Sequence, residues 1–288
     1  MPDQSPSWDP LADFQLLVQF HFMQNAVVVG TVVAVLAGAV GYFIVLRGQS
    51  FAAHMLSQVG FPGAAAAVLL HVSPVAGMVG FCLSSALGLN ALGRRAAPGS
   101  RVQAAATGSI LAFSIGLGLL FFRLSAGSAQ AIYAFLFGTI LGITDGDVSL
   151  AVATAALCLV GLAIICRPLL FASVDPDVAE AQGVPVRMLS TAFLVLVAIA
   201  VAESVQVVGT LLIFALLVAP AASARHLTAR PYRGLALSVV LSLLFTWAGL
   251  SVAYFSSYPV GFFITTFAFG AYLIARISGA RRPPWQVA

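Results

Sequence analysis

Long apolar stretches, free of acidic and basic side chains, make up most of the chain and are separated by short polar segments. A helix needs about 20 apolar residues to cross a bilayer. Six stretches reach roughly that length, and the longest have room for two helices joined by a turn. They are residues 14–46, 48–93, 102–122, 148–166, 188–224 (interrupted by Glu203) and 234–275.

Turn-forming residues divide the longest stretches. Val72-Ser73-Pro74 splits the second stretch into a helical hairpin, and Ser-Ser-Tyr-Pro at 256–259 splits the last. The stretch 188–224 predicts two spans that meet near Glu203, its one charged residue. We therefore predict an all-α, polytopic transmembrane bundle of about nine spans.

Residues 131–143 are apolar but too short to cross the bilayer. We expect a re-entrant half-helix here, ended by the turn Thr144-Asp145-Gly146-Asp147. A segment of this kind is stable at membrane depth only where protein or a water-filled cavity covers it.

Composition supports the same class of protein. Hydrophobic residues make up 61% of the chain, charged residues 8%, and the mean hydropathy is +1.05. A soluble domain carries about a quarter charged residues, so the excess apolar surface must face lipid. We predict a single transmembrane domain over residues 1–288, with a lead-in at 1–15 and a tail at 277–288.

The basic residues give the orientation. Nine spans and one re-entrant segment place every arginine except Arg123 on one side, which the positive-inside rule makes cytoplasmic. The N-terminus is then outside and the tail cytoplasmic. The twelve arginines on the cytoplasmic side are Arg47, Arg94, Arg95, Arg101, Arg167, Arg187, Arg225, Arg230, Arg233, Arg276, Arg281 and Arg282.

The charged residues also exclude function classes. The chain has no lysine, so it lacks the lysine that P-loop ATPases place on the nucleotide phosphates. ATP can therefore act only in a partner. Glu203 is the one carboxylate within an apolar stretch, which argues against a proton- or sodium-coupled carrier. The arginines mark span ends and form no basic patch with interleaved aromatics, so nucleic-acid binding is not predicted.

The three cysteines occupy positions that suit packing residues. Their spacing matches neither a disulfide framework nor a site for a covalently bound cofactor.

A polar cytoplasmic segment over residues 167–187 has the signals of a short helix. Asp175 precedes Pro176, Asp177 and Glu180 suit the first turns, and Gly183 ends the helix. A short, capped, polar helix of this kind is suited to docking a partner, although an ordinary loop helix has the same pattern.

Ordered motifs resemble those of the zinc/manganese/iron-type ABC transporter permease family. The pattern Asp175-Pro176, Ala179, Gly183, Pro185 resembles the coupling helix of type II ABC importers, where the permease meets its ATPase. Further motifs run along the chain in the family's order. They are Phe22-Met23-Gln24-Asn25-Ala26, Ser57 to Gly63, Phe137-Gly138-Thr139-Ile140, and Val208 to Ala222. Within them we expect Pro62, Gly63, Gly209 and Pro220 to serve helix packing.

The resemblance implies a type II importer permease in a bacterial cytoplasmic membrane, multi-pass and present in two copies. It implies an ABC ATPase beneath the permease and an extracellular metal-binding protein above it. The transported divalent metal, zinc or manganese, is then the cargo. A permease for a metal chelate, or a stand-alone secondary carrier, remains the alternative.

The expected metal pathway includes His54, Gln58 and, at the outer end of the same hairpin, His71. The resembled family has Asp and His where this chain has His54 and Gln58. The i, i+4 spacing places both side chains on one helical face. Imidazole in place of carboxylate favours zinc over a harder ion such as manganese. Gln58 is a poor ligand, so strong binding needs donors from another helix or a second copy. An interior histidine bonded to a neighbouring helix is the alternative for His54.

Overall fold

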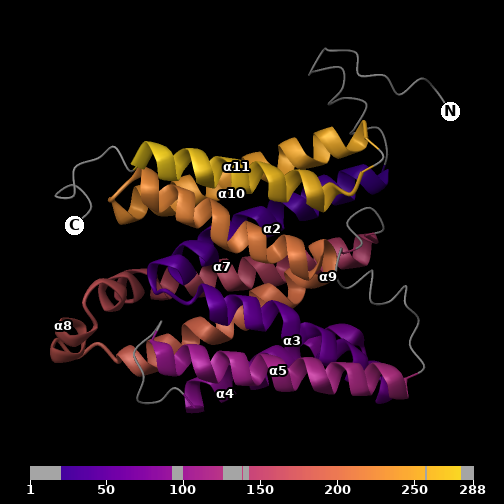
Figure 1. The fold of residues 1–288 in the computed structure, drawn as a ribbon, viewed down its shortest axis with the longest axis horizontal. Helices are drawn as coiled ribbons and strands as arrows, with labels where there is room; N and C mark the ends of the chain where they lie inside the picture. The colour runs from indigo at the N-terminus through magenta and orange to yellow at the C-terminus, as the bar shows by residue number, and fades with distance from the viewer. Residues whose placement is uncertain (1–20, 93–99, 126–137, 139–142, 257, 280–288) are drawn as a thin grey trace.

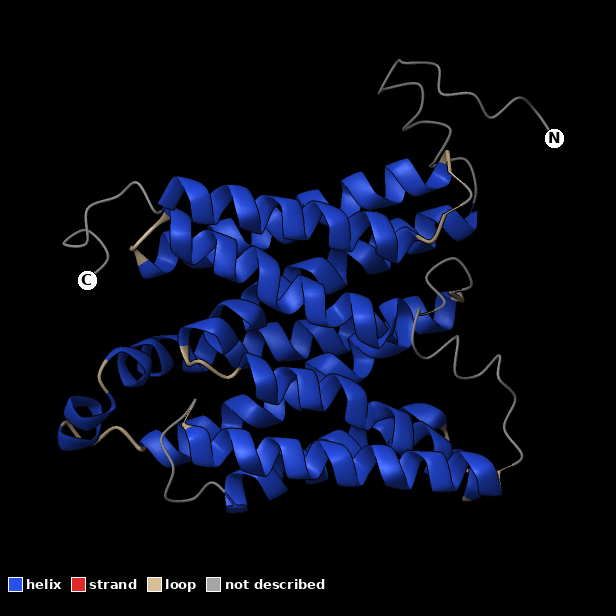
Figure 2. Ribbon diagram, viewed as in Figure 1, coloured by secondary structure: helices blue, strands red, loops and turns tan. Residues whose placement is uncertain are grey.

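The computed structural model describes all of the chain except residues 1–20, 93–99, 126–137, 139–142, 257 and 280–288. The described part contains nine helices (Figures 1 and 2). Eight are long and apolar enough to cross a membrane. The helices are α2 (His21–Leu46), α3 (Ser50–Leu69), α4 (Pro74–Leu92), α5 (Arg101–Leu124), α7 (Asp145–Val174), the short α8 (Pro176–Ala181), α9 (Val186–Leu227), α10 (Pro231–Tyr254) and α11 (Val260–Gly279).

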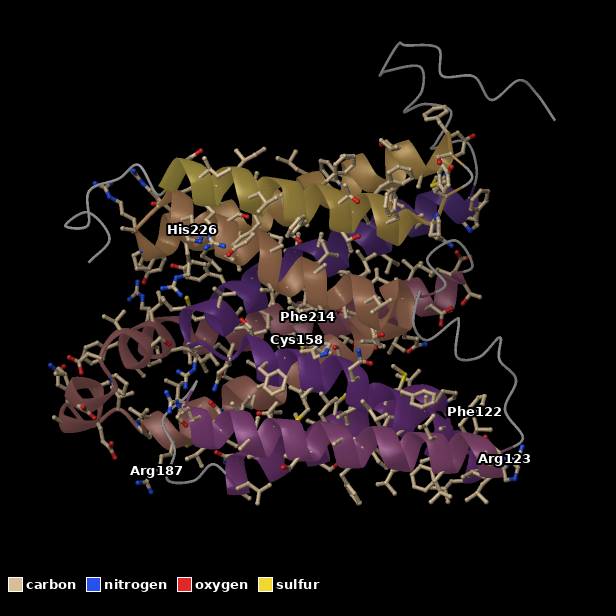
Figure 3. All side chains as sticks on the ribbon, viewed as in Figure 1. Phe122, Arg123, Cys158, Arg187, Phe214 and His226 are labelled. Atoms are coloured by element: carbon tan, nitrogen blue, oxygen red, sulfur yellow. The ribbon has the colours of Figure 1, made fainter. Side chains whose placement is uncertain are left out.

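Helix α9 is a folded-back pair of spans. Gly209 has φ 79° and ψ 163°, which breaks the helix between residues 186–208 and 210–227. Arg187 and His226, near the two ends of α9, lie at the same end of the molecule, and Arg123 lies at the opposite end (Figure 3). Counting the two arms separately gives the expected nine spans. The predicted break near Glu203 was six residues too early, because a buried carboxylate does not interrupt helical backbone, whereas glycine at this φ does.

The all-helical, membrane-spanning class is confirmed, with two local corrections. The turn at Thr144 begins α7, and α7 continues through Pro168 to Val174, beyond the predicted end at residue 166. Leu169, Leu170 and Ala172 are buried, so packing outweighs the one backbone hydrogen bond that the proline removes. The lead-in, most of the predicted re-entrant helix and most of the tail fall outside the described residues.

Three helices form the centre of the bundle. In the most apolar part of α2, α3 and α9, 72%, 67% and 67% of residues are buried, against 17–33% in the other five long helices. The outer helices expose large apolar side chains along their length, among them Phe113, Ile164 and Phe269. In water such surfaces would be unfavourable, and lipid is the solvent they suit.

Small residues let the central helices approach closely. A Cβ added at Gly63 of α3 would lie 2.8 Å from the carbonyl carbon of Gly77 in α4. A Cβ at Gly41 of α2 would meet the backbone of Leu217 in the second arm of α9. Backbone contact of this kind is the usual basis of helix association in lipid. Pro62 and Pro220 are buried inside α3 and α9.

Candidate functional site

His54 of α3 and Phe214 of α9 form the centre of the candidate pathway. Their ring centroids are 4.7 Å apart at 61°, an edge-on packing, and Phe214 lies near the middle of the molecule (Figure 3). His54 Nδ1 is buried and has no hydrogen-bond partner. The alternative from the sequence was an interior histidine bonded to a neighbouring helix, and Nδ1 makes no such bond. An unbonded imidazole nitrogen at membrane depth is an available metal ligand.

Gln58 lies one turn beyond His54 on the same helix, and both are half-buried. Pro62 has no N–H, so the helix provides no hydrogen bond to the Gln58 carbonyl four residues earlier. The proline thereby leaves one backbone oxygen available beside the Gln58 side chain. From the sequence, Pro62 was expected only to serve helix packing.

Polar atoms on both sides of the α9 break also lack partners. Gln206 Oε1 and Thr210 Oγ1 are buried without a hydrogen bond. Thr210 lies one turn before Phe214, as Gln58 lies one turn after His54. Helices α3 and the second arm of α9 run antiparallel, because α3 leads toward the Arg123 end and the arm returns from it (Figure 3). Gln58 and Thr210 are therefore at a similar depth.

These donors suit transient rather than tight binding. Among the described residues, no three His, Cys, Asp or Glu side chains lie close enough together to hold a metal ion. One imidazole with amide, hydroxyl and carbonyl oxygens is a weak set for zinc, whose stable sites use several histidines or cysteines. A conducting site requires such weakness, because the ion must also leave.

His71 does not join His54. It is exposed at the end of α3, about 25 Å further along the helix at 1.5 Å per residue. Its φ is 55°, and its N–H donates to the Val68 carbonyl while Val72 donates to Ala67. This is a helix C-terminal cap normally formed by glycine, so the backbone conformation accounts for the position of His71.

A polar group at the Arg123 end links α2 to α7. His21 Nε2 lies 2.9 Å from Asp145 Oδ1, and Asn25 Nδ2 donates to the same oxygen at 2.8 Å. Thr144 and Asp147 form a capping box at the start of α7. The contact between Asn25 and Asp145 was not predicted from the sequence, although the motif around Asn25 and the carboxylate at a span end pointed to both residues.

Glu203 is 5% exposed in the first arm of α9. It lies within electrostatic range of Asp147 and Cys158 of α7. Asp145, Asp147 and Glu203 therefore lie in the Arg123 half of the α7–α9 region. Negative charge on the exposed Asp145 carboxylate at this end attracts cations.

The predicted polar helix forms α8. Asp175 caps it by accepting a hydrogen bond from the Val178 N–H at 3.0 Å, and Pro176 occupies the first helical position. Gly183, with φ 83°, ends it while its N–H donates to Glu180 and Val184 donates to Ala179.

Helix α8 projects beyond the ends of the long helices (Figure 1). Ala179 is fully buried, and α8 contacts both α7 and α9. Asp177 and Glu180 are exposed, as are the apolar side chains of Val174, Val178 and Met188. Exposed apolar side chains beside acidic ones, clear of the spanning helices, are typical of a protein-docking surface.

Comparison with known proteins matches residues 19–279 to the model of the ABC 3 transport family. The chain belongs to this family. The permease-family resemblance drawn from the motifs is thereby confirmed. The chain is 31% identical, over 85% of its length and 86% of the relative's, to the manganese import system permease protein ScaB of Streptococcus parasanguinis. It is 28% identical, over 83% and 84%, to the manganese transport system membrane protein MntC of Listeria innocua.

Solved structures agree with the fold. The chain superimposes on PsaBC from Streptococcus pneumoniae, solved in complex with Fab, with TM-score 0.81 and 29% identity over 92% of this chain and 94% of that one. An inward-facing metal-chelate type ABC transporter gives TM-score 0.73 at 16% identity, covering 96% and 93%. The second likeness shows the fold alone.

Proposed function

We propose that this family member is the permease subunit of an ABC importer that moves a divalent transition-metal ion, zinc or manganese, across a bacterial cytoplasmic membrane. The observation that carries the proposal is the buried, unbonded His54 Nδ1 between α3 and α9. The manganese relatives support the class of cargo. The imidazole favours zinc among such ions.

The two ends of the molecule suggest the partners of the permease. We propose that α8 docks an ABC ATPase through Val178, Glu180 and their exposed neighbours, and that ATP is bound only there. We propose that an extracellular metal-binding protein delivers the ion to the end that carries Asp145. We propose that a second copy of the permease doubles the weak donor set around His54. Strong binding requires such additional donors, because Gln58 is a poor ligand.

Reconstitution tests the proposal. The permease and its ATPase are purified and reconstituted in liposomes. The metal-binding protein is added outside and ATP is enclosed inside, and uptake of radioactive zinc and of manganese is measured. We expect uptake of one of the ions only with hydrolysable ATP. Uptake driven by a proton gradient alone would identify a secondary carrier. Uptake that requires a chelator would identify a chelate permease.

A further inference from the structure

Arg47 is a buried charge at the junction of α2 and α3. It is 6% exposed and ends α2, where Gly48, with φ 65°, turns the chain so that Gly48 N–H donates to Val45 and Gln49 N–H donates to Ile44. Helix α3 begins two residues later, and His54 lies seven residues after Arg47. The capped turn therefore fixes the direction in which the Arg47 side chain leaves the α2–α3 junction.

The guanidinium of Arg47 contacts both segments that flank α8. These segments, the stems of α8, are the end of α7 and the start of α9. Nη1 donates to Ser173 Oγ at 3.3 Å, and Nη2 donates to Ser190 Oγ at 2.6 Å. Ser173 lies two residues before the Asp175 cap, and Ser190 lies in the first turn and a half of α9. The hydroxyl of Ser173 in turn donates to the Leu169 carbonyl, so its oxygen is oriented to accept from Arg47.

The guanidinium plane is also held by packing. Its central carbon lies 5.8 Å from the ring centroid of Phe193, one turn beyond Ser190, a distance within the cation–π range. Its Nε has no partner. Two neutral hydroxyls and an aromatic ring stabilise the Arg47 charge less than water does. No carboxylate pairs with Arg47 among the described residues. Stability alone would favour an apolar side chain, whereas bridging both stems requires the planar fork of arginine.

We propose that Arg47 is a positioning residue that transmits movement of α8 to α3, and through α3 to His54. The inference rests on the proposed docking of an ATPase at α8. Among the described residues, no other hydrogen bond joins the stems of α8 to the α2–α3 turn. A displacement of Ser173 and Ser190 together therefore moves the guanidinium, and the short turn passes that movement to the first turn of α3.

The test compares Arg47→Lys with the double variant Ser173→Ala/Ser190→Ala in the reconstituted complex. Arg225→Lys is the matched control, because Arg225 also binds the end of α2, donating to the Val45 carbonyl at 2.9 Å, yet contacts neither serine. We expect assembly with the ATPase and ATP hydrolysis to persist in both test variants, while metal ions moved per ATP fall roughly tenfold, a typical size for coupling. The control should keep the wild-type ratio.

A second readout is independent of the cargo. Spin labels on Asp177→Cys in α8 and Phe51→Cys in α3, in a chain with Cys166→Ser, report the distance between the two helices. We expect that distance to change with ATP in the otherwise wild-type complex and to stay fixed with Arg47→Lys. An unchanged ATP response and an unchanged transport ratio in both test variants would overturn the role of Arg47. If the wild-type complex moves no metal, the proposed cargo fails, and the labels still decide the role of Arg47.

Discussion

Gly138 and Gly209 lie backbone against backbone, and both have positive φ, 75° and 79°. A Cβ added at Gly138 would come within 2.6 Å of the Gly209 nitrogen and 2.5 Å of the Val208 carbonyl carbon. The two residues come from separate motifs, 71 positions apart in the chain. Gly138 is therefore packed on the break that separates the two arms of α9.

Substitution of either glycine should destabilise the fold. Gly209→Ala places a Cβ in a backbone region that only glycine adopts readily, at about 1–3 kcal/mol, and Gly138→Ala adds a backbone clash. We expect both to lower the Tm of the detergent-solubilised permease by several degrees. Gly80→Ala in α4 is the control, because nothing lies within 4 Å of its added Cβ. An unchanged Tm in both variants would contradict this account of the break.

His54→Ala should greatly reduce transport without unfolding the protein. The Nδ1 atom makes no hydrogen bond, so the substitution removes the proposed metal ligand and little else apart from packing on Phe214. We expect metal uptake to fall roughly tenfold or more, because loss of a ligand costs at least as much as loss of a residue that supports one, with normal purification yield. His71→Ala should retain uptake, since His71 is exposed and distant. Equal loss in both variants would remove the assignment of His54.

A double substitution should shift ion preference. His54→Asp with Gln58→His restores the carboxylate and imidazole pair of the resembled family on the same helical face. Oxygen donors favour harder ions, so we expect the ratio of manganese to zinc uptake to rise several-fold. Competition between the two ions in liposomes measures it, with Gln58→His alone as the control. A ratio that stays at the wild-type value would show that selectivity is set elsewhere.

Reversal of charge on α8 should weaken ATPase binding. Glu180 is exposed on the outer face of the helix, and Glu180→Arg should reduce affinity for the ATPase roughly tenfold, equivalent to about 1.4 kcal/mol. Gly183→Leu should act similarly, because leucine disfavours φ 83°. Arg101→Glu, an exposed reversal at the start of α5, is the control. Wild-type association and transport in both α8 variants would leave the docking surface without support.

Thiol labelling should confirm the orientation. In a chain with Cys166→Ser, we expect Ser125→Cys, beside Arg123, to react with an impermeant maleimide on intact cells. Glu180→Cys should react only after permeabilisation. Cys82 and Cys158 are buried and should stay unlabelled. The reverse pattern would invert the assignment from the positive-inside rule.

The fold class and most helix ends were predictable from local sequence. Apolar run length determines which segments enter lipid, since no other surroundings satisfy them. The α3–α4 turn and α8 were equally predictable, because Pro74, Pro176 and Gly183 act on backbone conformation within a few residues. The α9 break was misplaced, because sequence shows Glu203 as a charge but does not show that packing buries it, while Gly209 adopts its φ against Gly138.

The sequence by itself determined that this protein crosses a membrane in about nine spans, lacks the lysine of a P-loop ATPase and has His54 and Gln58 on one helical face. Only the tertiary structure decided that Phe214 packs on His54 and that Arg47 bridges Ser173 and Ser190. The physical reason is range. Helix periodicity and capping act over about one turn, whereas these contacts join residues 126 to 160 positions apart, and only the packing of whole helices brings them together.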